Sequence, residues 1–253
     1  MKITFLGTGT SQGIPVIACT CEVCQSSDKK DKRSRVSILI STEQKNLVID
    51  TGPDFRTQML ENQVNRLDAV YFTHEHRDHT AGLDDIRPFN FKQKSDMPIY
   101  ASKQVQVSLR KSFDYIFDNP YPGIPKIIFH DVTKDKSFWI GDIHIQPIEY
   151  FHAHLPVLGF RVKNFAYLTD FKEISADQEK YLKDLDVLVL SVVQFTPHYS
   201  HLHLSEALDY INKWKPKITY LTHLSHNLGR HEALEFDLPA HVKLAFDGMT
   251  LEI

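Results

Sequence analysis

Four side chains with metal-binding chemistry stand close together in residues 73–80, which read Thr-His-Glu-His-Arg-Asp-His-Thr. They are His74, His76, Asp78 and His79. Neutral imidazole and carboxylate groups are ligands that zinc, manganese and iron accept. A histidine-rich surface turn is the alternative interpretation, but the spacing His-x-His-x-Asp-His puts all four groups on one tight turn. The segment therefore predicts a metal site, and a catalytic one.

Three further polar residues each come directly after an apolar run that is typical of a buried strand. They are His152, Asp170 and His223. A structural polar residue with its hydrogen bonds made would explain any one of them alone. Their shared position after a strand instead favours convergence on one metal-binding edge. His154 lies two residues after His152 and is an alternative ligand.

A cysteine-rich loop over about residues 18–35 indicates a second metal site. Cys19, Cys21 and Cys24 have the spacing Cys-x-Cys-x-x-Cys, which can occupy three corners of a zinc tetrahedron. The chain has no fourth cysteine, so a histidine from elsewhere is expected to close the site. Free or redox-active thiols are the alternative. The basic run at 29–35 is expected to be a solvated face, although Arg33 and Arg35 would also suit a phosphate.

Length and composition favour one large α/β domain, since the chain has 253 residues of which 42% are hydrophobic. The formal charge of −3 gives no general argument for binding nucleic acid or membrane. Neither a signal peptide nor a membrane span is evident in the sequence. We therefore expect a cytoplasmic location, where clustered thiols stay reduced and more often bind metal than form disulfides.

The elements that must position these residues are mostly short strands. Strands are predicted over 2–6, 36–40, 46–50, 69–72, 97–101, 127–132, 137–140, 143–150, 159–163, 165–169, 187–190 and 217–221, with a terminal pair at 242–246 and 249–253. Helices are predicted over 81–88, 102–112, 175–183, 205–215 and about 230–235. Pro88 is expected to stop the first helix, Ser102 to cap the second, and residues 119–125 to form a loop.

Two turns near strand ends need separate interpretations. The glycines in residues 7–13 superficially resemble a dinucleotide-binding fingerprint, but proline and cysteines follow instead of a helix, so tight turning of the backbone is favoured. Asp50 ends a predicted strand and could orient a metal-bound imidazole through its free ring N–H. Capping of the turn is the equally weighted alternative for Asp50.

Taken together, the seven ligand candidates resemble the metallo-β-lactamase superfamily in order and chemical type, over nearly the whole chain. The narrower resemblance is to the phosphoribosyl 1,2-cyclic phosphate phosphodiesterase family. It rests on residues 5–15, the Cys19-x-Cys21-x-x-Cys24 loop, residues 155–161 (Leu-Pro-Val-Leu-Gly-Phe-Arg) and residues 221–226 (Leu-Thr-His-Leu-Ser-His). The resemblance implies an α/β fold, an αββα sandwich of two mixed β-sheets with helices on the outer faces, in a single domain over 1–253.

The resemblance also implies how the metals are held. One of two divalent ions, zinc or manganese, would bind His74, His76 and His152. The other would bind Asp78, His79 and His223, with Asp170 bridging the two. His226, three residues after His223, would complete a structural zinc site with Cys19, Cys21 and Cys24.

The implied activity is hydrolysis of a small cyclic phosphodiester, such as a phosphoribosyl cyclic phosphate or a 2′,3′-cyclic nucleotide. Two divalent ions about 3.5–4 Å apart would activate the attacking water, and Asp78 would belong to the catalytic centre. His201 would protonate the leaving group, although His203 is an alternative.

The sequence leaves three rival functions. A tRNA-processing nuclease is disfavoured by the absence of a long inserted arm and by the mildly acidic chain. A protein like the pyrroloquinoline quinone biosynthesis B group shares the cysteine loop and would not be hydrolytic. A metal or ligand sensor would have little need of seven intact ligands. The expected partner is thus a small phosphodiester substrate, without membrane or nucleic acid, and a homodimer is compatible with the sequence.

Overall fold

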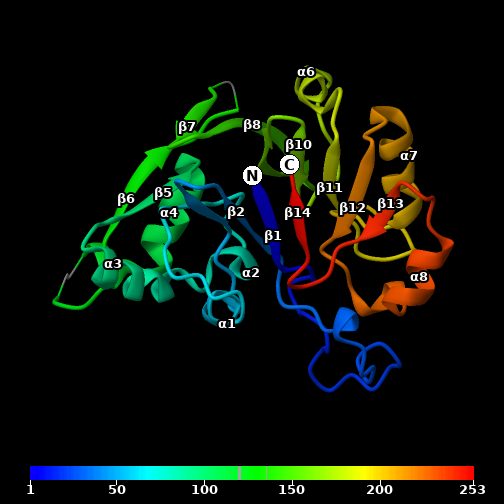
Figure 1. The fold of residues 1–253 in the computed structure, drawn as a ribbon, viewed down its shortest axis with the longest axis horizontal. Coiled ribbons are helices and arrows are strands. Elements are labelled where there is room, and N and C mark those ends of the chain that lie inside the picture. Colours follow the sequence, from blue (N-terminus) through cyan, green and yellow to red (C-terminus); the bar gives the residue numbers. More distant parts are fainter. Residues whose placement is uncertain (119–120, 135) are drawn as a thin grey trace.

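Two β-sheets form the centre of the computed structural model, which describes residues 1–118, 121–134 and 136–253 (Figure 1). The first sheet has the strand order β14 (Thr250–Glu252), β1 (Lys2–Gly7), β2 (Ser37–Ser41), β3 (Asn46–Ile49), β4 (Ala69–Tyr71), β5 (Met97–Ala101) and β6 (Ile127–Asp131). The second has the order β13 (Val242–Leu244), β12 (Ile218–Thr222), β11 (Val187–Ser191), β10 (Phe165–Leu168), β9 (Leu155–Val162), β8 (Ile143–His152) and β7 (Phe138–Ile140). Both sheets mix parallel and antiparallel pairs.

Helices cover the outer face of each sheet. The α-helices are α1 (Phe55–Glu61), α2 (Arg77–Thr80), α3 (Arg87–Gln93), α4 (Lys103–Ser112), α5 (Asp114–Phe117), α6 (Ala176–Glu179), α7 (Leu204–Trp214) and α8 (His231–Asp237). Short 3₁₀ helices are η1 (Lys29–Asp31), η2 (Leu83–Ile86), η3 (Lys180–Leu182) and η4 (His226–Leu228). In Figure 1, α1 to α4 lie beside the first sheet, and α7 and α8 lie on the far side of the second.

The core explains this layering. Along β1 and β2, side chains alternate between the two faces of the first sheet. Ile3, Phe5 and Ile38 belong to the cluster between the sheets, whereas Leu6 and Leu39 pack on the helix side. Both faces of the sheet are therefore buried, which confirms the predicted αββα sandwich.

Three predicted elements are wrong in detail. The terminal strands do not pair with each other: β13 pairs with β12 in the second sheet, and β14 pairs with β1 in the first. The turn at Gly248 crosses between the sheets, with its N–H bonded to the carbonyl of Phe5. Pro88 does not stop a helix but lies in the first turn of α3, where its missing N–H costs nothing. The strand predicted at 159–163 begins four residues earlier, as β9.

Other predictions hold. Ser102 caps α4, with its side chain accepting a hydrogen bond from the Val105 amide. The glycine-rich turn after β1 leads into irregular backbone rather than a helix, as predicted. Residues 121–125 of the predicted 119–125 loop are irregular, and residues 119–120 lie outside the described part of the chain. Within the described residues, no helix has the length and apolar character needed to cross a membrane.

Candidate metal centres

The predicted metal ligands gather where strands of both sheets end. His74 follows β4, His152 ends β8, Asp170 follows β10 and His223 follows β12. A backbone hydrogen bond of 3.0 Å from Leu158 N to Thr73 O links the two sheets at this edge. Strand ends that are far apart in sequence therefore deliver their polar groups to one place.

Three residues at this edge have unusual backbone conformations. Asp50, Asp170 and His223 have φ values of 65°, 52° and 56°, in the left-handed region that non-glycine residues seldom adopt. Asp50 and His223 directly follow β3 and β12, and Asp170 lies two residues after the end of β10. The chain therefore turns sharply just after each of these strands. Such conformations persist where the surroundings fix them, and they cluster at functional sites.

The turn that carries His76, Asp78 and His79 packs tightly against the end of β3. A Cβ atom on Gly52 would lie 2.2 Å from the carbonyl oxygen of Asp78, so only glycine fits there. The close approach brings Asp50 to His79, whose Nδ1 lies 2.7 Å from Asp50 Oδ2. Thr73 fixes the same carboxylate through its amide at 2.9 Å and its hydroxyl at 2.8 Å.

Asp170 lies at the middle of the cluster. Its Oδ2 is 3.1 Å from His79 Nε2, and its Oδ1 is 3.3 Å from His223 Nε2. Asp78 Oδ2 lies 3.5 Å from His79 Nε2 and 3.7 Å from His223 Nε2. The two carboxylates thus share the same pair of imidazoles, which is an arrangement suited to a cation.

His74, His76 and His152 form the other side of the cluster. The ring centroid of His76 is 4.6 Å from that of His74 and 5.2 Å from that of His152. His152 is buried and belongs to a group of possible metal ligands, whereas His154 is exposed and belongs to none among the described residues. The structure therefore brings His152 and not His154 to the predicted metal edge.

The donor set fits metal ions. Six buried ring nitrogens of this cluster have no hydrogen-bond partner among the described residues: His74 Nε2, His79 Nε2, His152 Nδ1, His201 Nδ1 and both nitrogens of His223. In His79, Nδ1 binds Asp50, which leaves Nε2 facing carboxylates. Because unpaired buried polar atoms are costly, a bound cation is the simplest partner for these nitrogens.

The carboxylates of the cluster also stabilise positive charge. Burial acts to lower the pKa of His79, but the carboxylates of Asp78, Asp170 and Asp50 outweigh burial and raise it well above its ordinary value. Burial acts to raise the pKa of Asp170, but His223 and His79 hold it well below its usual range. Without a metal, the carboxylates therefore keep a proton on an imidazole, and a divalent cation can take that place.

The structure separates the two predicted proton donors. His201 Nδ1 lies 3.7 Å from Asp170 Oδ1, and its ring stacks on His223 with centroids 5.1 Å apart. His203 precedes α7 and turns its Nδ1 to Glu206 Oε2 at 2.8 Å. Burial lowers the pKa of His201 to about 3, so its ring is neutral near pH 7 in the ligand-free chain. His201 alone of the two faces the cluster.

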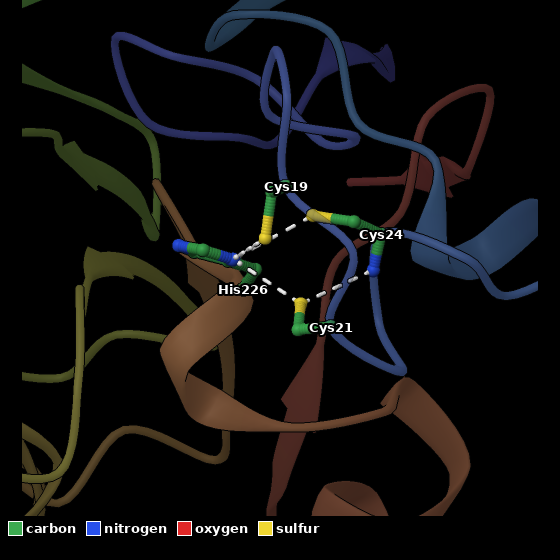
Figure 2. A group of neighbouring side chains, drawn as sticks. All are labelled: Cys19, Cys21, Cys24 and His226. Atoms are coloured by element: carbon green, nitrogen blue, oxygen red, sulfur yellow. Dashed lines mark hydrogen bonds between the residues drawn. The ribbon is translucent and has the colours of Figure 1, made fainter.

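The three cysteines converge on His226 (Figure 2). Their Sγ atoms lie 3.3, 3.3 and 3.5 Å from His226 Nδ1 for Cys19, Cys21 and Cys24. A tetrahedral zinc ion with its usual bond lengths would hold sulfur and nitrogen about 3.6 Å apart. The amide of Cys24 and the ring of His226 lower the pKa of Cys21 to about 6, which favours the thiolate that binds zinc.

The basic run 29–35 differs from the expected solvated face. Arg33 is buried, with Nη1 donating to Thr8 Oγ1 at 2.7 Å and Nη2 lying 3.0 Å from His231 Nδ1. Arg35 makes a salt bridge of 2.9 Å with Asp54. Both guanidinium groups thus have protein partners, and the Arg35 side chain stays partly exposed.

Two contributors to the site escape the sequence patterns. Thr73 holds Asp50, and Lys172 contacts the backbone of His201. Thr73 is the first residue of the segment 73–80, so its position was a usable signal. Lys172 carries no such signal, because an isolated lysine after a strand is usually a solvated surface residue.

Comparisons with known proteins place the chain in a family. Residues 45–224 match the model of the β-lactamase superfamily domain. The crystal structure of a new diphosphatase from the PhnP family has a TM-score of 0.93 and 37% identity, covering 99% of this chain and 96% of that chain. Zn²⁺-bound PqqB from Methylobacterium extorquens has a TM-score of 0.79 at 17% identity, with complete coverage of both chains. The second likeness shows the fold alone.

A curated relative is the octanoyltransferase of Porphyromonas gingivalis (strain ATCC BAA-308 / W83), which is 38% identical over 252 residues. The match covers 98% of this chain and 51% of that protein, so the chain spans about half the length of this relative. The match over residues 45–224, together with the two facing sheets, shows that the chain belongs to the metallo-β-lactamase superfamily and resembles the PhnP family within it.

Proposed function

We propose that this chain is a metal-dependent hydrolase that acts on a small phosphorus-containing substrate. Two oxygens of the substrate would each link the attacked phosphorus atom to another part of the molecule. A cyclic phosphodiester, either a phosphoribosyl cyclic phosphate or a 2′,3′-cyclic nucleotide, is the first candidate substrate. The observation that carries the proposal is the position of the Asp170 carboxylate, which lies beside His79 and His223 and within 4.8 Å of ligand atoms of both His74 and His152.

Two metal positions follow from this arrangement. His74, His76 and His152 would hold one divalent cation, zinc or manganese. Asp78, His79 and His223 would hold the other, and Asp170 would bridge them. When bound, two such cations supply Lewis acidity that activates water and offsets charge on a phosphoryl group.

The chain's own residues prepare the site for that chemistry. Asp50 accepts the Nδ1 proton of His79 and so keeps Nε2 free as a metal ligand. Burial of His74, His79 and Asp170 keeps bulk water away and strengthens the electrostatics. His201 lies beside Asp170 and would protonate the leaving oxygen, taking up its proton when an anionic phosphate enters and favours the imidazolium.

A diphosphate is the second candidate substrate. The specific observation in its favour is the similarity to the PhnP-family diphosphatase over nearly the full length of both chains. A phosphodiester and a diphosphate both have a phosphorus atom with two bridging oxygens. The same ligands and the same proton donor would therefore serve either substrate.

Acyl transfer has less support. Enzymes that pass an acyl group through a covalent intermediate often use a cysteine nucleophile. All three cysteines of this chain face His226, which disfavours such a role for them. The octanoyltransferase name belongs to a protein about twice as long, and a thioester assay tests whether that activity extends to this chain.

The test is metal analysis of the purified protein together with a substrate panel. The panel contains a cyclic ribose phosphate, 2′,3′-cyclic nucleotides, bis(p-nitrophenyl) phosphate, ADP-ribose, a precursor tRNA, an octanoyl thioester and a lactam. We expect metal-dependent turnover of the phosphodiesters or the diphosphate and none of the thioester or lactam. Loss of turnover in His76→Ala and Asp78→Ala would tie the activity to the cluster.

Two results would contradict the proposal. Hydrolysis of the tRNA alone would favour a processing nuclease. Turnover of no substrate by fully metal-loaded protein would favour a non-hydrolytic metalloprotein, as in the pyrroloquinoline quinone biosynthesis B group, or a sensor.

A further inference from the structure

An ion pair outside the predicted ligand set contacts the segment that carries His201. Lys172 lies two residues after Asp170, and its Nζ donates a hydrogen bond of 3.2 Å to the backbone carbonyl of His201. The same ammonium donates to both carboxylate oxygens of Glu206, at 3.0 and 2.9 Å. Lys172 thus joins the strand end that carries Asp170 to the loop that carries His201.

Glu206 anchors the other side of this connection. It lies in the first turn of α7, where its Oε2 accepts a hydrogen bond of 3.3 Å from the His203 amide. The same oxygen lies 2.8 Å from His203 Nδ1. Because α7 is held on the second sheet by Ala207 and Ile211, the carboxylate has a fixed place.

A backbone hydrogen bond runs parallel to the ion pair. The amide of Leu202 donates to the carbonyl of Phe171 at 3.2 Å, so the residues next to His201 and Asp170 are bonded directly. The side chains of Lys172 and Glu206 are 21% and 35% exposed, and partly exposed pairs contribute little to global stability. Their placement therefore matters more for local geometry than for folding.

We propose that Lys172 and Glu206 are positioning residues that hold His201 beside Asp170 for proton transfer to the leaving group. Lys172 fixes the backbone of His201, and Glu206 fixes Lys172. This inference rests on the proposed function, because it assigns the pair to the proton donor of that reaction.

A direct role in substrate binding is the alternative for Lys172. An ammonium group binds phosphates well, but here both carboxylate oxygens of Glu206 already occupy it. The two roles predict effects of Glu206→Gln on different kinetic constants. Release of a phosphate-binding lysine would lower KM, whereas loss of positioning lowers kcat and leaves KM unchanged.

The experiment compares leaving groups in metal-loaded full-length protein. A 2′,3′-cyclic nucleotide expels an alkoxide that needs a proton, whereas bis(p-nitrophenyl) phosphate expels a stable phenolate that does not. We expect Lys172→Met and Glu206→Gln each to lower kcat on the cyclic nucleotide by about tenfold or more, with little change on the aryl diester. Lys213→Met and Glu179→Gln are matched controls, since this ion pair of 2.5 Å joins α7 to α6 rather than to the segment that carries His201.

Three results would overturn the inference. Equal losses on both substrates would indicate a structural role. A lowered KM in Glu206→Gln would indicate that Lys172 binds substrate. An unchanged kcat on the cyclic nucleotide would show that the pair does not act on His201.

A second measurement separates this inference from the proposed function. NMR of the ring nitrogens in ¹⁵N-histidine-labelled, metal-loaded protein reports the stacking of His201 on His223 without any turnover. We expect the His201 signals to shift in Lys172→Met and Glu206→Gln but not in the control variants. Unshifted signals would refute the positioning role even if the chain hydrolysed none of the substrates.

Discussion

His79 Nδ1 lies 2.7 Å from Asp50 Oδ2, and both side chains are completely buried. The contact selects which ring nitrogen of His79 faces Asp78 and Asp170. A residue that binds no metal thereby decides how a predicted ligand is presented, which is the usual task of a carboxylate behind a metal-bound imidazole.

Replacing Asp50 should therefore weaken metal binding without touching a ligand. We expect Asp50→Ala to lower affinity for the active-site metals by about 10–100-fold, since His79 loses its orienting partner. Competition with a chelator, followed by metal analysis, measures this change. Asp54→Asn is the control, because Asp54 lies on the same loop as Asp50 but does not contact His79. Its carboxylate forms a salt bridge with Arg35 instead. Equal metal affinity in Asp50→Ala and wild type would contradict the orienting role.

The two histidines before α7 should differ in their effects on catalysis. We expect His201→Ala to lower kcat on a substrate with an alkoxide leaving group by about 10²–10⁴-fold, because the proton donor is lost. His203→Ala should have a much smaller effect, since its ring faces Glu206 rather than Asp170. Steady-state kinetics of both variants decides the assignment. A larger loss in His203→Ala would reverse it.

The cysteine site should stabilise the fold independently of the active-site metals. We expect Cys21→Ser and His226→Ala to lose the zinc held by this loop and to lower the melting temperature by at least several degrees, because zinc binding contributes folding free energy. Calorimetry and metal analysis test this together. Asn227→Ala is the control, since Asn227 is exposed beside His226. Retention of zinc in His226→Ala would show that another residue completes the site.

Asp247 should make stability depend on pH. Burial raises the pKa of this carboxyl to about 6, against the opposing effects of the Ser34 amide, the Thr8 hydroxyl and Arg33. Between about pH 4 and 6 the folded chain keeps a proton that the unfolded chain releases, so this group's contribution to stability falls as pH rises through that window.

The matching experiment uses Asp247→Asn. The free energy of unfolding of wild type relative to the variant should fall by roughly 1–3 kcal/mol between about pH 4 and 6, with the lower end favoured because Asp247 is partly exposed. Urea unfolding at several pH values measures this difference. A difference that is constant with pH, or that rises, would show that burial does not raise the pKa of Asp247.

The sequence by itself determined those features of this protein that depend on the order of residues along the chain. The spacing of His74, His76, Asp78 and His79 depends only on chain order, and so does the position of His152, Asp170 and His223 after apolar runs. Apolar alternation and continuous apolar runs report burial, so most strands could be predicted from them. The αββα sandwich was implied by the family resemblance. The family resemblance supplied His226 as the partner of the three cysteines.

Only the tertiary structure decided which of two nearby residues faces the site. His152 and His154 are equivalent by type and differ by burial, and His201 and His203 differ in whether the ring meets Asp170 or Glu206. The two last strands look like a hairpin in sequence but join opposite sheets, because β1 and β12 each offer a free edge. Lys172 and Glu206 are 34 residues apart, and their contact arises because α7 packs on the sheet to which β10 belongs. Such choices depend on neighbours far away in the chain, which no local pattern of residues records.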